Sequence, residues 1–214
     1  LGVAIDSDGN TLLYGAFSGT LDLGGPPLTG AGAFVSKLDA EGNHLWSKSL
    51  STSGVPATPR AIATDRYDNV LLIGDFSSRV DFGCGPLTSS GGSQDVFVVK
   101  LDSDGNHLWS RAFGDDAFQL GWGVAADTDG SVLITGDHNG TIDFGGGPLT
   151  SPAGQSHVFL AKLDADGAHV WSRDFGNGSI QYVSGVTTDT SNSVVVTGYF
   201  FGSVDFGGGP LTSI

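Results

Sequence analysis

An internal repeat is the feature that most constrains the fold of this chain. Segments that align with one another begin at Gly2, Arg60, Gly123 and Gly185. Their equivalent aspartates recur about every 62 residues, at Asp6, Asp65, Asp127 and Asp189. Tryptophans follow the same interval at Trp46, Trp109 and Trp171. A regular repeat of this length predicts equivalent structural units that pack against one another.

Each complete repeat predicts four β-strands. In the third repeat the expected strands are 123–127, 131–137, 157–164 and 168–175. They are short, rich in β-branched and aromatic residues, and separated by turns that contain Asp and Gly. The long connection between the second and third strands contains the sequences TIDF and PLTS, which suggest a small extra hairpin. No longer segment has the period of a helix.

We therefore predict an all-β fold, a β-propeller built from four-stranded antiparallel blades. Known propeller blades run about 40–50 residues, and the long second connection accounts for the surplus here. Residues 1–214 would form a single propeller segment of about 3.5 repeats. The expected repeats are 2–59, 60–122, 123–184 and a half repeat at 185–214. A solenoid is the alternative, although its repeats are usually shorter and contain helices or single strands.

Composition excludes several classes of partner. The formal net charge is −14, which disfavours nucleic acid because its phosphates would be repelled. No apolar stretch is long enough for a membrane-spanning helix, so membrane insertion is not expected. Cys84 is the single cysteine, which excludes a scaffold held by internal disulfides.

Three sequence patterns indicate a family. They are GVAxDxDG, then [VI]DFGxGPLTS, then VFxxKLDxDGxHxWSR, where x is variable. Together they resemble the SBBP group of bacterial β-propeller repeats, and the first is also similar to NHL repeats. The resemblance covers the whole chain. It implies a secreted or cell-surface bacterial propeller, and it implies no catalytic activity because the family has no shared active site.

The turns after the first and third strands of each repeat are rich in acidic residues. In a propeller both turns project from the same face, which should therefore be acidic. Paired carboxylates at these turns are candidates for calcium ligands: Asp6, Asp8, Asp102, Asp104, Asp127, Asp129, Asp164 and Asp166. The favoured alternative is turn chemistry, in which Asp binds nearby backbone amides. These turns lack the distal carboxylate of a typical calcium loop, so we expect no cofactor, with calcium the one candidate.

Other repeated residues suggest structural roles. Basic residues recur at Lys37, Lys100 and Lys162, and again at Lys48, Arg111 and Arg173. Their position beside recurring acids favours internal ion pairs over a binding patch. The repeated tryptophans lie on the expected outermost strand, where filling space between blades is favoured over stacking on a sugar.

Candidate ligand-binding residues come mainly from the segments that differ between repeats. The connections 50–59, 113–122 and 175–184 are expected on the face opposite the acidic turns. Their mixed aromatic and polar side chains suit carbohydrate or peptide recognition: Asp116, Phe118, Trp122, Gln181 and Tyr182. Four repeated aspartates, Asp22, Asp81, Asp143 and Asp205, either cap a glycine-rich turn or accept hydroxyl groups from a ligand. The sequence leaves both readings open.

Histidine offers little support for catalysis. Three histidines occupy equivalent positions after a turn, whereas His138 and His157 occur once each, in or beside the long second connection. No cluster of histidines or acids unique to one blade is evident, and no established catalytic motif is present. We therefore expect the chain not to be an enzyme.

The sequence thus predicts a non-enzymatic extracellular propeller that binds or scaffolds a glycan or protein partner through its loop faces. The alternative is a dedicated multivalent lectin with an equivalent sugar site in each blade. A propeller needs about four to eight blades to close its ring, and an open sheet edge invites pairing. We therefore expect the chain to form a homo-oligomer or to be part of a longer polypeptide.

Overall fold

The computed structural model describes residues 1–50, 57–176 and 181–213. All of the regular secondary structure in these residues is β-strand, and every strand pairing is antiparallel. No helix among the described residues has the length and apolar character that crossing a bilayer requires. The prediction of an all-β fold is confirmed.

The first repeat forms one four-stranded sheet in the order β1-β2-β3-β4. Its strands are β1 (Gly2–Ile5), β2 (Thr11–Leu21), β3 (Leu28–Leu38) and β4 (His44–Ser49). The β2–β3 pair is unusually long, because it extends as one ladder from Thr11↔Leu38 to Leu21↔Leu28. The first repeat therefore absorbs the predicted extra hairpin into its main sheet.

The second and third repeats form sheets of the same kind, each with a separate small hairpin between the second and third strands. The second sheet contains β5 (Thr58–Thr64), β6 (Val70–Phe76), β9 (Asp95–Leu101) and β10 (His107–Phe113), with the hairpin β7 (Arg79–Asp81) and β8 (Pro86–Thr88). The third contains β11 (Gln119–Ala126), β12 (Val132–His138), β15 (His157–Leu163) and β16 (His169–Phe175), with the hairpin β13 (Thr141–Asp143) and β14 (Pro148–Thr150). The predicted TIDF and PLTS hairpin is confirmed.

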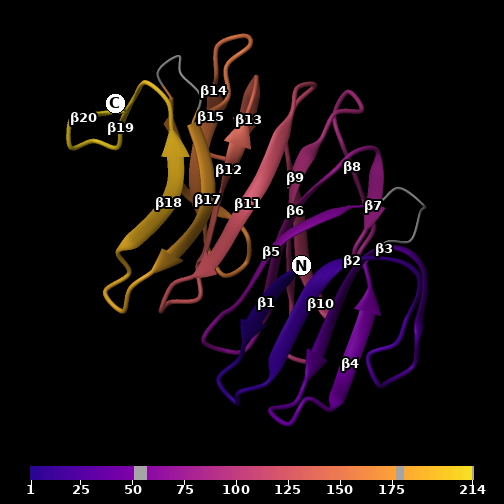
Figure 1. Ribbon diagram of the computed structural model, residues 1–214. Helices are drawn as coiled ribbons and strands as arrows, with labels where there is room; N and C mark the ends of the chain where they lie inside the picture. The colour runs from indigo at the N-terminus through magenta and orange to yellow at the C-terminus, as the bar shows by residue number, and fades with distance from the viewer. Residues whose placement is uncertain (51–56, 177–180, 214) are drawn as a thin grey trace.

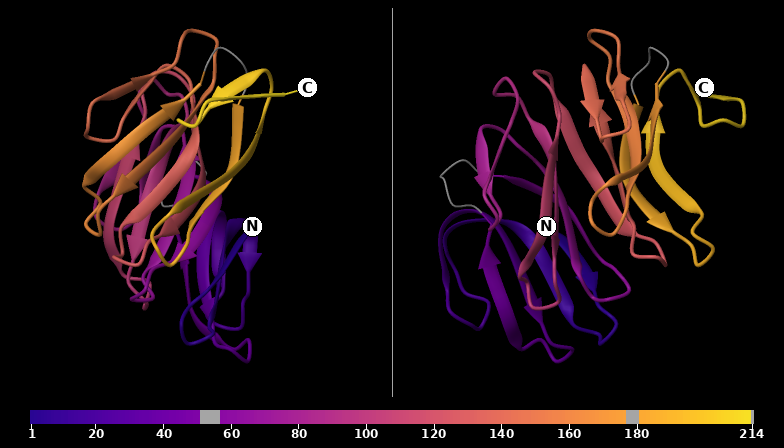
Figure 2. Two further views of the ribbon diagram at one scale, coloured as in Figure 1. Left: turned by 90° about the vertical axis from the view of Figure 1, so that its left-hand side faces the viewer. Right: turned by 180° about the vertical axis from the view of Figure 1, so that it is seen from behind.

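The fourth repeat contributes two strand pairs. They are β17 (Gln181–Thr188) with β18 (Val194–Phe200), and the hairpin β19 (Ser203–Asp205) with β20 (Pro210–Thr212). The first strands of successive repeats, β1, β5, β11 and β17, lie next to one another. Figures 1 and 2 show the sheets packed face to face in chain order, from the N-terminal blade to the C-terminal strands. The chain is therefore a β-propeller segment with its first strands innermost.

The hydrophobic core lies between the blades, in two clusters. Leu12 and Tyr14 of the first blade pack with Leu72 and Phe97 of the second. Leu71 on the opposite side of β6 belongs to the cluster shared with the third blade. Because a middle blade is buried on both faces, all seven residues of β6 are buried. This explains why the strand reads as a continuous apolar run rather than an alternating one.

The innermost strands carry a β-bulge at an equivalent position in three repeats. The register shifts between Pro59 and Ala61, between Gly121 and Gly123, and between Val183 and Gly185. A bulge leaves an extra residue outside the ladder and redirects its side chain. The redirected residues are Arg60, Trp122 and Ser184. Equivalent backbone positions therefore present different side chains in each repeat.

Candidate functional site

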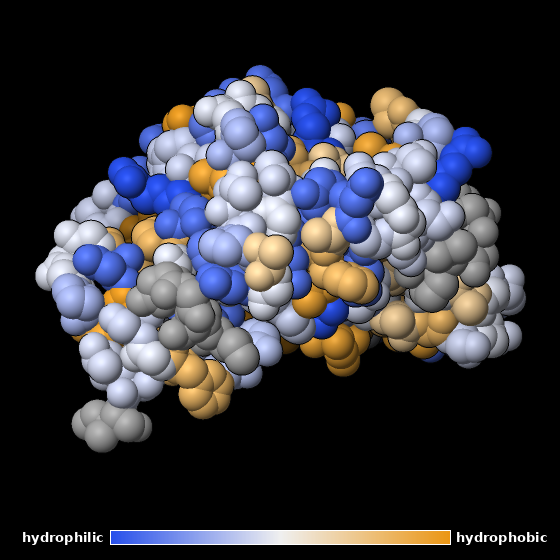
Figure 3. All heavy atoms as spheres, turned by 90° about the horizontal axis from the view of Figure 1, so that it is seen from above, coloured by the Kyte–Doolittle hydropathy of each residue, from blue (hydrophilic) through white to orange (hydrophobic). Residues whose placement is uncertain are grey.

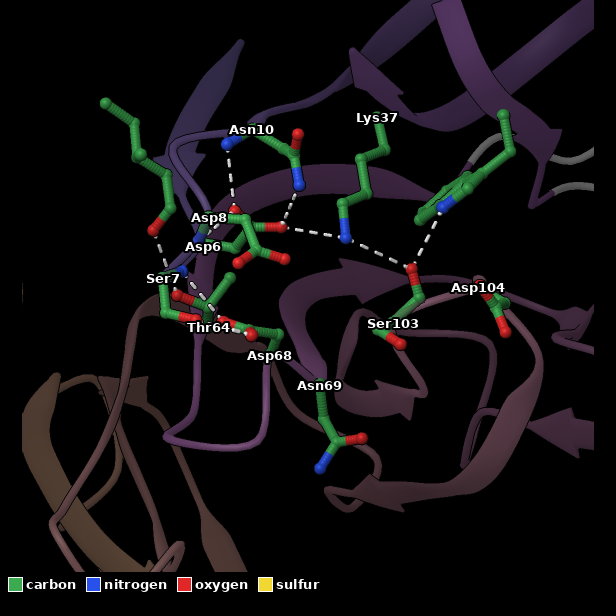
Figure 4. A network of polar contacts seen from close by, with 12 residues as sticks. Asp6, Ser7, Asp8, Asn10, Lys37, Thr64, Asp68, Asn69, Ser103 and Asp104 are labelled. Carbon is green, nitrogen blue, oxygen red and sulfur yellow. Dashed lines mark hydrogen bonds and ion pairs between the residues drawn. The ribbon is translucent and has the colours of Figure 1, made fainter. Parts of the chain in front are cut away.

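The acidic turns are held by hydrogen bonds within each turn. In the first blade, Oδ1 of Asp6 accepts bonds from the backbone amides of Asp8 at 3.1 Å and Asn10 at 2.8 Å. Its Oδ2 accepts a bond from Asn10 Nδ2 at 2.9 Å and forms an ion pair with Lys37 Nζ at 2.8 Å (Figure 4). The turn chemistry that the sequence favoured is thus present at Asp6.

The recurring lysine and tryptophan join each blade to the next. Lys37 Nζ and Trp46 Nε1 both donate to the carbonyl oxygen of Ser103, in the β9–β10 turn, at 3.3 and 3.0 Å (Figure 4). Lys100 and Trp109 make the same pair of bonds to Ala165, at 3.3 and 2.9 Å. The predicted ion pairs are confirmed for Lys37, Lys100 and Lys162. The predicted position of tryptophan between blades is confirmed for Trp46 and Trp109. These bonds also show that the turns after the first and third strands of a blade lie on the same face.

The eight calcium candidates divide into two groups. The first acid of each turn accepts hydrogen bonds from backbone amides of its own turn. These residues are Asp6, Asp102, Asp127 and Asp164. Asp6 and Asp127 also form ion pairs with lysine. The second acid of each turn has an exposed side chain: these residues are Asp8, Asp104, Asp129 and Asp166. In the part of the chain that the structure describes, these turns bring no three metal-ligating side chains together. Calcium binding here stays a prediction.

The bonds of the turns also determine the charge of their carboxylates. Burial opposes ionisation of Asp6, but the bonds from Lys37 and Asn10 outweigh it, and the pKa of Asp6 lies below its ordinary value. The pKa of Asp65 is lowered in the same way by Asn69 and Lys100, against the effect of burial. The repeated carboxylates are therefore held in their charged form.

The repeated aspartates of the long connections cap the glycine-rich turns. Oδ1 of Asp143 accepts bonds from the amides of Gly145 at 2.7 Å and Gly147 at 3.1 Å. Equivalent bonds are made by Asp22, Asp81 and Asp205. Of the two readings that the sequence left open, the cap is present in all four repeats. A role in binding a ligand at these residues stays a prediction.

The loop-face candidates occupy different environments. Asp116 and Phe118 are exposed, Trp122 is half-buried and Gln181 is buried. Gln181 and Tyr182 share a mainly apolar pocket with Tyr199 and Phe206, which Asp116, Phe118 and Trp122 do not line. Figure 3 views the molecule from above Figure 1, the side of the hairpins β13–β14 and β19–β20, where hydrophobic and hydrophilic side chains are intermixed.

Trp122 belongs to a polar cluster that sequence reasoning did not foresee. The Arg60 guanidinium stacks 4.1 Å from the centre of the Trp122 ring and forms an ion pair with Asp75 at 2.6 Å. Trp122 Nε1 donates to Asp137 at 2.7 Å. The signal was a charged residue at the same place in two apolar strands, in the sequences IGDF and TGDH.

Three buried carboxyl groups on this side have raised pKa values. Burial raises the pKa of Asp137 to about 6, although the bond from Trp122 opposes it. Burial also raises the pKa of Asp95 to about 6, with a further contribution from the charges of Asp115 and Asp116. The pKa of Asp75 is raised by burial despite its ion pair with Arg60. On the same side, hydrogen bonds outweigh burial and lower the pKa values of Asp115 and Asp174, so the direction of the shift depends on the bonds that each carboxyl group accepts.

A second unforeseen cluster joins two histidines to one aspartate in the third blade. His138 Nε2 lies 2.9 Å from Asp174 Oδ1, and His157 Nδ1 lies 2.9 Å from Asp174 Oδ2. One ligating atom from each of the three residues lies within 4.8 Å of the others, so the group could hold a metal ion. The expectation that no histidine cluster is unique to one blade was wrong, because residues distant in sequence meet only after the strands pair.

Comparison of the repeats would have revealed this cluster. In the second blade the positions of His138, His157 and Asp174 are occupied by Phe76, Asp95 and Ala112. His138 thus replaces a phenylalanine that the other repeats share, and His157 and Asp174 accompany it only in the third blade. None of these three differences indicates a site by itself, but their occurrence together in one blade does.

No model of a known protein family matches this chain. The chain is 23% identical over 188 residues to an uncharacterised WD repeat-containing protein of Acanthamoeba polyphaga mimivirus, a match that covers 74% of this chain and 13% of the viral protein. It is 27% identical over 166 residues to the regulatory protein FlaEY of Caulobacter vibrioides, covering 68% of this chain and 17% of that protein. The chain thus spans a small part of the length of both relatives. The first likeness fits a repeat protein of the propeller type.

Proposed function

We propose that this chain is a non-enzymatic part of an extracellular bacterial β-propeller of the SBBP type, and that it binds a protein partner through its loop face. The loop face is defined here by the fourth-to-first-strand connections and the bulge residues Arg60 and Trp122. The observation that carries the proposal is that the two faces are built from different kinds of residue. Residues that repeat are used between blades, and residues that vary are gathered on the other face.

The variation on the loop face favours a protein partner over a repeated sugar site. A lectin with one site per blade requires equivalent side chains in equivalent places, but the bulge positions carry Arg60, Trp122 and Ser184. The aspartates that do repeat on this side are engaged as turn caps. A single surface built from unlike residues suits one extended partner, with the exposed ring of Phe118 as an anchor.

The two ends of the segment support a role within a larger assembly. Val3 and Ile5 on the first blade are each 64% exposed. Tyr199 on β18 is 55% exposed, although its equivalents Asp75 and Asp137 are covered by the next blade. Exposed apolar sheet faces of this kind require a cover. We infer that further blades cover them, supplied by the same polypeptide or by a second copy of this chain.

The binding proposal is tested with two probes, a displayed library of random peptides and a printed glycan array. We expect peptides to be selected and their binding to be lost in the variant Phe118→Ser, because Phe118 is 58% exposed. The matched control is Leu45→Ser, because Leu45 is 49% exposed on the outer strand of the first blade and should not affect binding. Glycan binding without peptide binding, or peptide binding that survives Phe118→Ser, would refute the proposal.

The assembly proposal is tested by size-exclusion chromatography with light scattering on the 214-residue chain. We expect self-association that Tyr199→Lys weakens, because a charge on this face cannot be covered by an apolar sheet. A stable monomer that unfolds cooperatively and is unaffected by Tyr199→Lys would exclude a second copy as the cover.

A further inference from the structure

The histidine cluster, defined as His138, His157 and Asp174, is built by three adjacent strands of one sheet. His138 on β12 lies directly opposite His157 on β15. Asp174 on β16 is paired with Phe159, which is two residues from His157 on the same strand. Because side chains alternate between the faces of a strand, all three project from the same face of the third blade. Rigid paired strands therefore hold the ligating atoms.

Packing alone does not explain why buried polar side chains occupy these positions. The positions equivalent to His138 are occupied by Phe17, Phe76 and Phe200, so an apolar ring suits this place in the fold. The imidazole of His138 is fully buried, and that of His157 is 7% exposed. Each ring keeps one buried nitrogen, Nδ1 of His138 and Nε2 of His157, without a hydrogen-bond partner among the described residues. Burial of polar atoms without partners is costly, so histidine stabilises this place in the fold less than the phenylalanine of the other repeats would.

The donor set identifies the class of ligand. Two imidazole nitrogens and one carboxylate oxygen suit a divalent first-row transition metal, whereas calcium and magnesium prefer oxygen ligands alone. Zinc bonds of about 2.1 Å in a tetrahedral site separate ligating atoms by about 3.4 Å. The nitrogen–oxygen distances of 2.9 Å need only a small outward movement to reach this geometry.

An ion also has access to the cluster. The side chain of Asp174 is 24% exposed. It lines a surface pocket together with Arg173, Phe206 and Gly207. A net charge of −14 raises the local concentration of cations near the protein. Three protein ligands leave one coordination position, which would face this pocket and be open to water or to a group from a partner.

We propose that His138, His157 and Asp174 bind a divalent transition metal ion, with Zn²⁺ as the ion of best fit. The ion joins the ends of β12, β15 and β16 on the loop side of the third blade. The site belongs to the third blade alone and is absent from the equivalent positions of the second blade.

The test is titration of the metal-free 214-residue chain with ZnCl₂ by isothermal calorimetry, with Co²⁺ absorption as a reporter of coordination. We expect one ion per chain and a rise in Tm of about 5–10 °C at a hundredfold excess over Kd. The variant His138→Phe restores the residue of the sibling blades and should keep the fold. It should weaken Zn²⁺ binding by at least about tenfold.

The matched control is His169→Gln, in the same blade. His169 Nε2 lies 3.2 Å from Ser172 Oγ. Because His169 lies outside the cluster, its replacement should leave Zn²⁺ affinity unchanged. A second ligand variant, Asp174→Ala, restores the alanine of the second blade and should weaken binding like His138→Phe. Absence of a one-to-one zinc isotherm for the unaltered chain would overturn the proposal, and so would equal affinity in His138→Phe.

Discussion

The two faces of this molecule use the same strands for different purposes. The turn face is the one that carries the acidic turns after the first and third strands of each blade, and the loop face lies opposite to it. On the turn face, the repeated aspartate forms an ion pair with the lysine of its own blade, and the lysine and tryptophan of the first two blades bond to the next blade. On the loop face, equivalent backbone positions carry unlike residues, which form the Arg60–Trp122 stack and the histidine cluster. In a repeat protein, residues that recur serve the neighbouring repeat, and departures from the repeat mark where to search for function.

The largest expected effect that tests this comparison is on the turn face. In Lys100→Met, the Asp65 carboxylate, whose side chain is fully buried, loses the ion pair that neutralises it. An uncompensated buried charge should lower the free energy of unfolding by about 3–5 kcal/mol. Urea unfolding at neutral pH measures it. The control is Lys48→Met, a half-buried cation of the same face that forms no ion pair among the described residues and bonds only weakly to Asn106, so its loss should cost under about 0.5 kcal/mol. Equal small losses in both variants would contradict a structural role for the repeated lysine.

The second prediction is that Asp137 on the loop face and the repeated aspartates of the acidic turns contribute opposite slopes to the dependence of stability on pH. The pKa of Asp137 is about 6 in the folded state and near its ordinary 3.8 in the unfolded state. Between about pH 4 and 6 the folded protein therefore retains a proton that the unfolded chain loses, and the free energy of unfolding falls as pH rises, by at most about 3 kcal/mol. Asp137→Asn should remove this part of the decline in urea titrations.

The turn face supplies the opposite slope. Because the folded pKa values of Asp6 and Asp65 are lowered, their contribution is complete above about pH 4 and is lost as pH falls below it. Asp137→Asn should leave this acid loss intact. A pH profile that is the same in the variant and the unaltered chain between pH 4 and 6 would contradict the loop-face assignment.

A smaller effect on the free energy of unfolding is expected for the tryptophans. Trp109 bonds to a turn of the next blade, whereas Trp171 has no such bond among the described residues. Trp109→Phe removes the indole bond to Ala165 and part of the contact with Gly167, so we expect a loss of about 1–2 kcal/mol in the free energy of unfolding. Trp171→Phe is the control, because no described residue accepts a bond from its indole nitrogen. Chemical denaturation of both variants should show the larger loss at Trp109. The reverse order would show that the bond between blades is unimportant.

The smallest effect concerns the repeated aspartates of the long connections. Asp143→Ala frees the amides of Gly145 and Gly147 and should cost about 1 kcal/mol of stability. Asp116→Ala, an exposed acid on the loop face, should change stability by less than about 0.5 kcal/mol. Thermal melting compares the two. If Asp143→Ala left stability unchanged but abolished binding of a selected peptide, the ligand reading would replace the cap.

Much of the fold followed from local patterns. The recurrence of Asp6, Asp65 and Asp127 indicated equivalent blades, and the alternation of apolar runs with Asp and Gly turns gave the four strands of each blade. Tryptophan between blades could be predicted because a large ring that recurs on the outermost strand has few other places to pack. The bonds that join Lys100 to Ala165 could not be predicted, because the partner lies in the next repeat.

The sequence by itself determined that equivalent sheets form and that their turns are rich in acids, since strand period and turn chemistry depend on neighbouring residues. Only the tertiary structure decided which side chains meet at the ends of the strands. His138, His157 and Asp174 become neighbours because β12, β15 and β16 pair in one register, and a shift of one residue would point them to opposite faces. Local propensities do not encode that register, which the packing between blades selects.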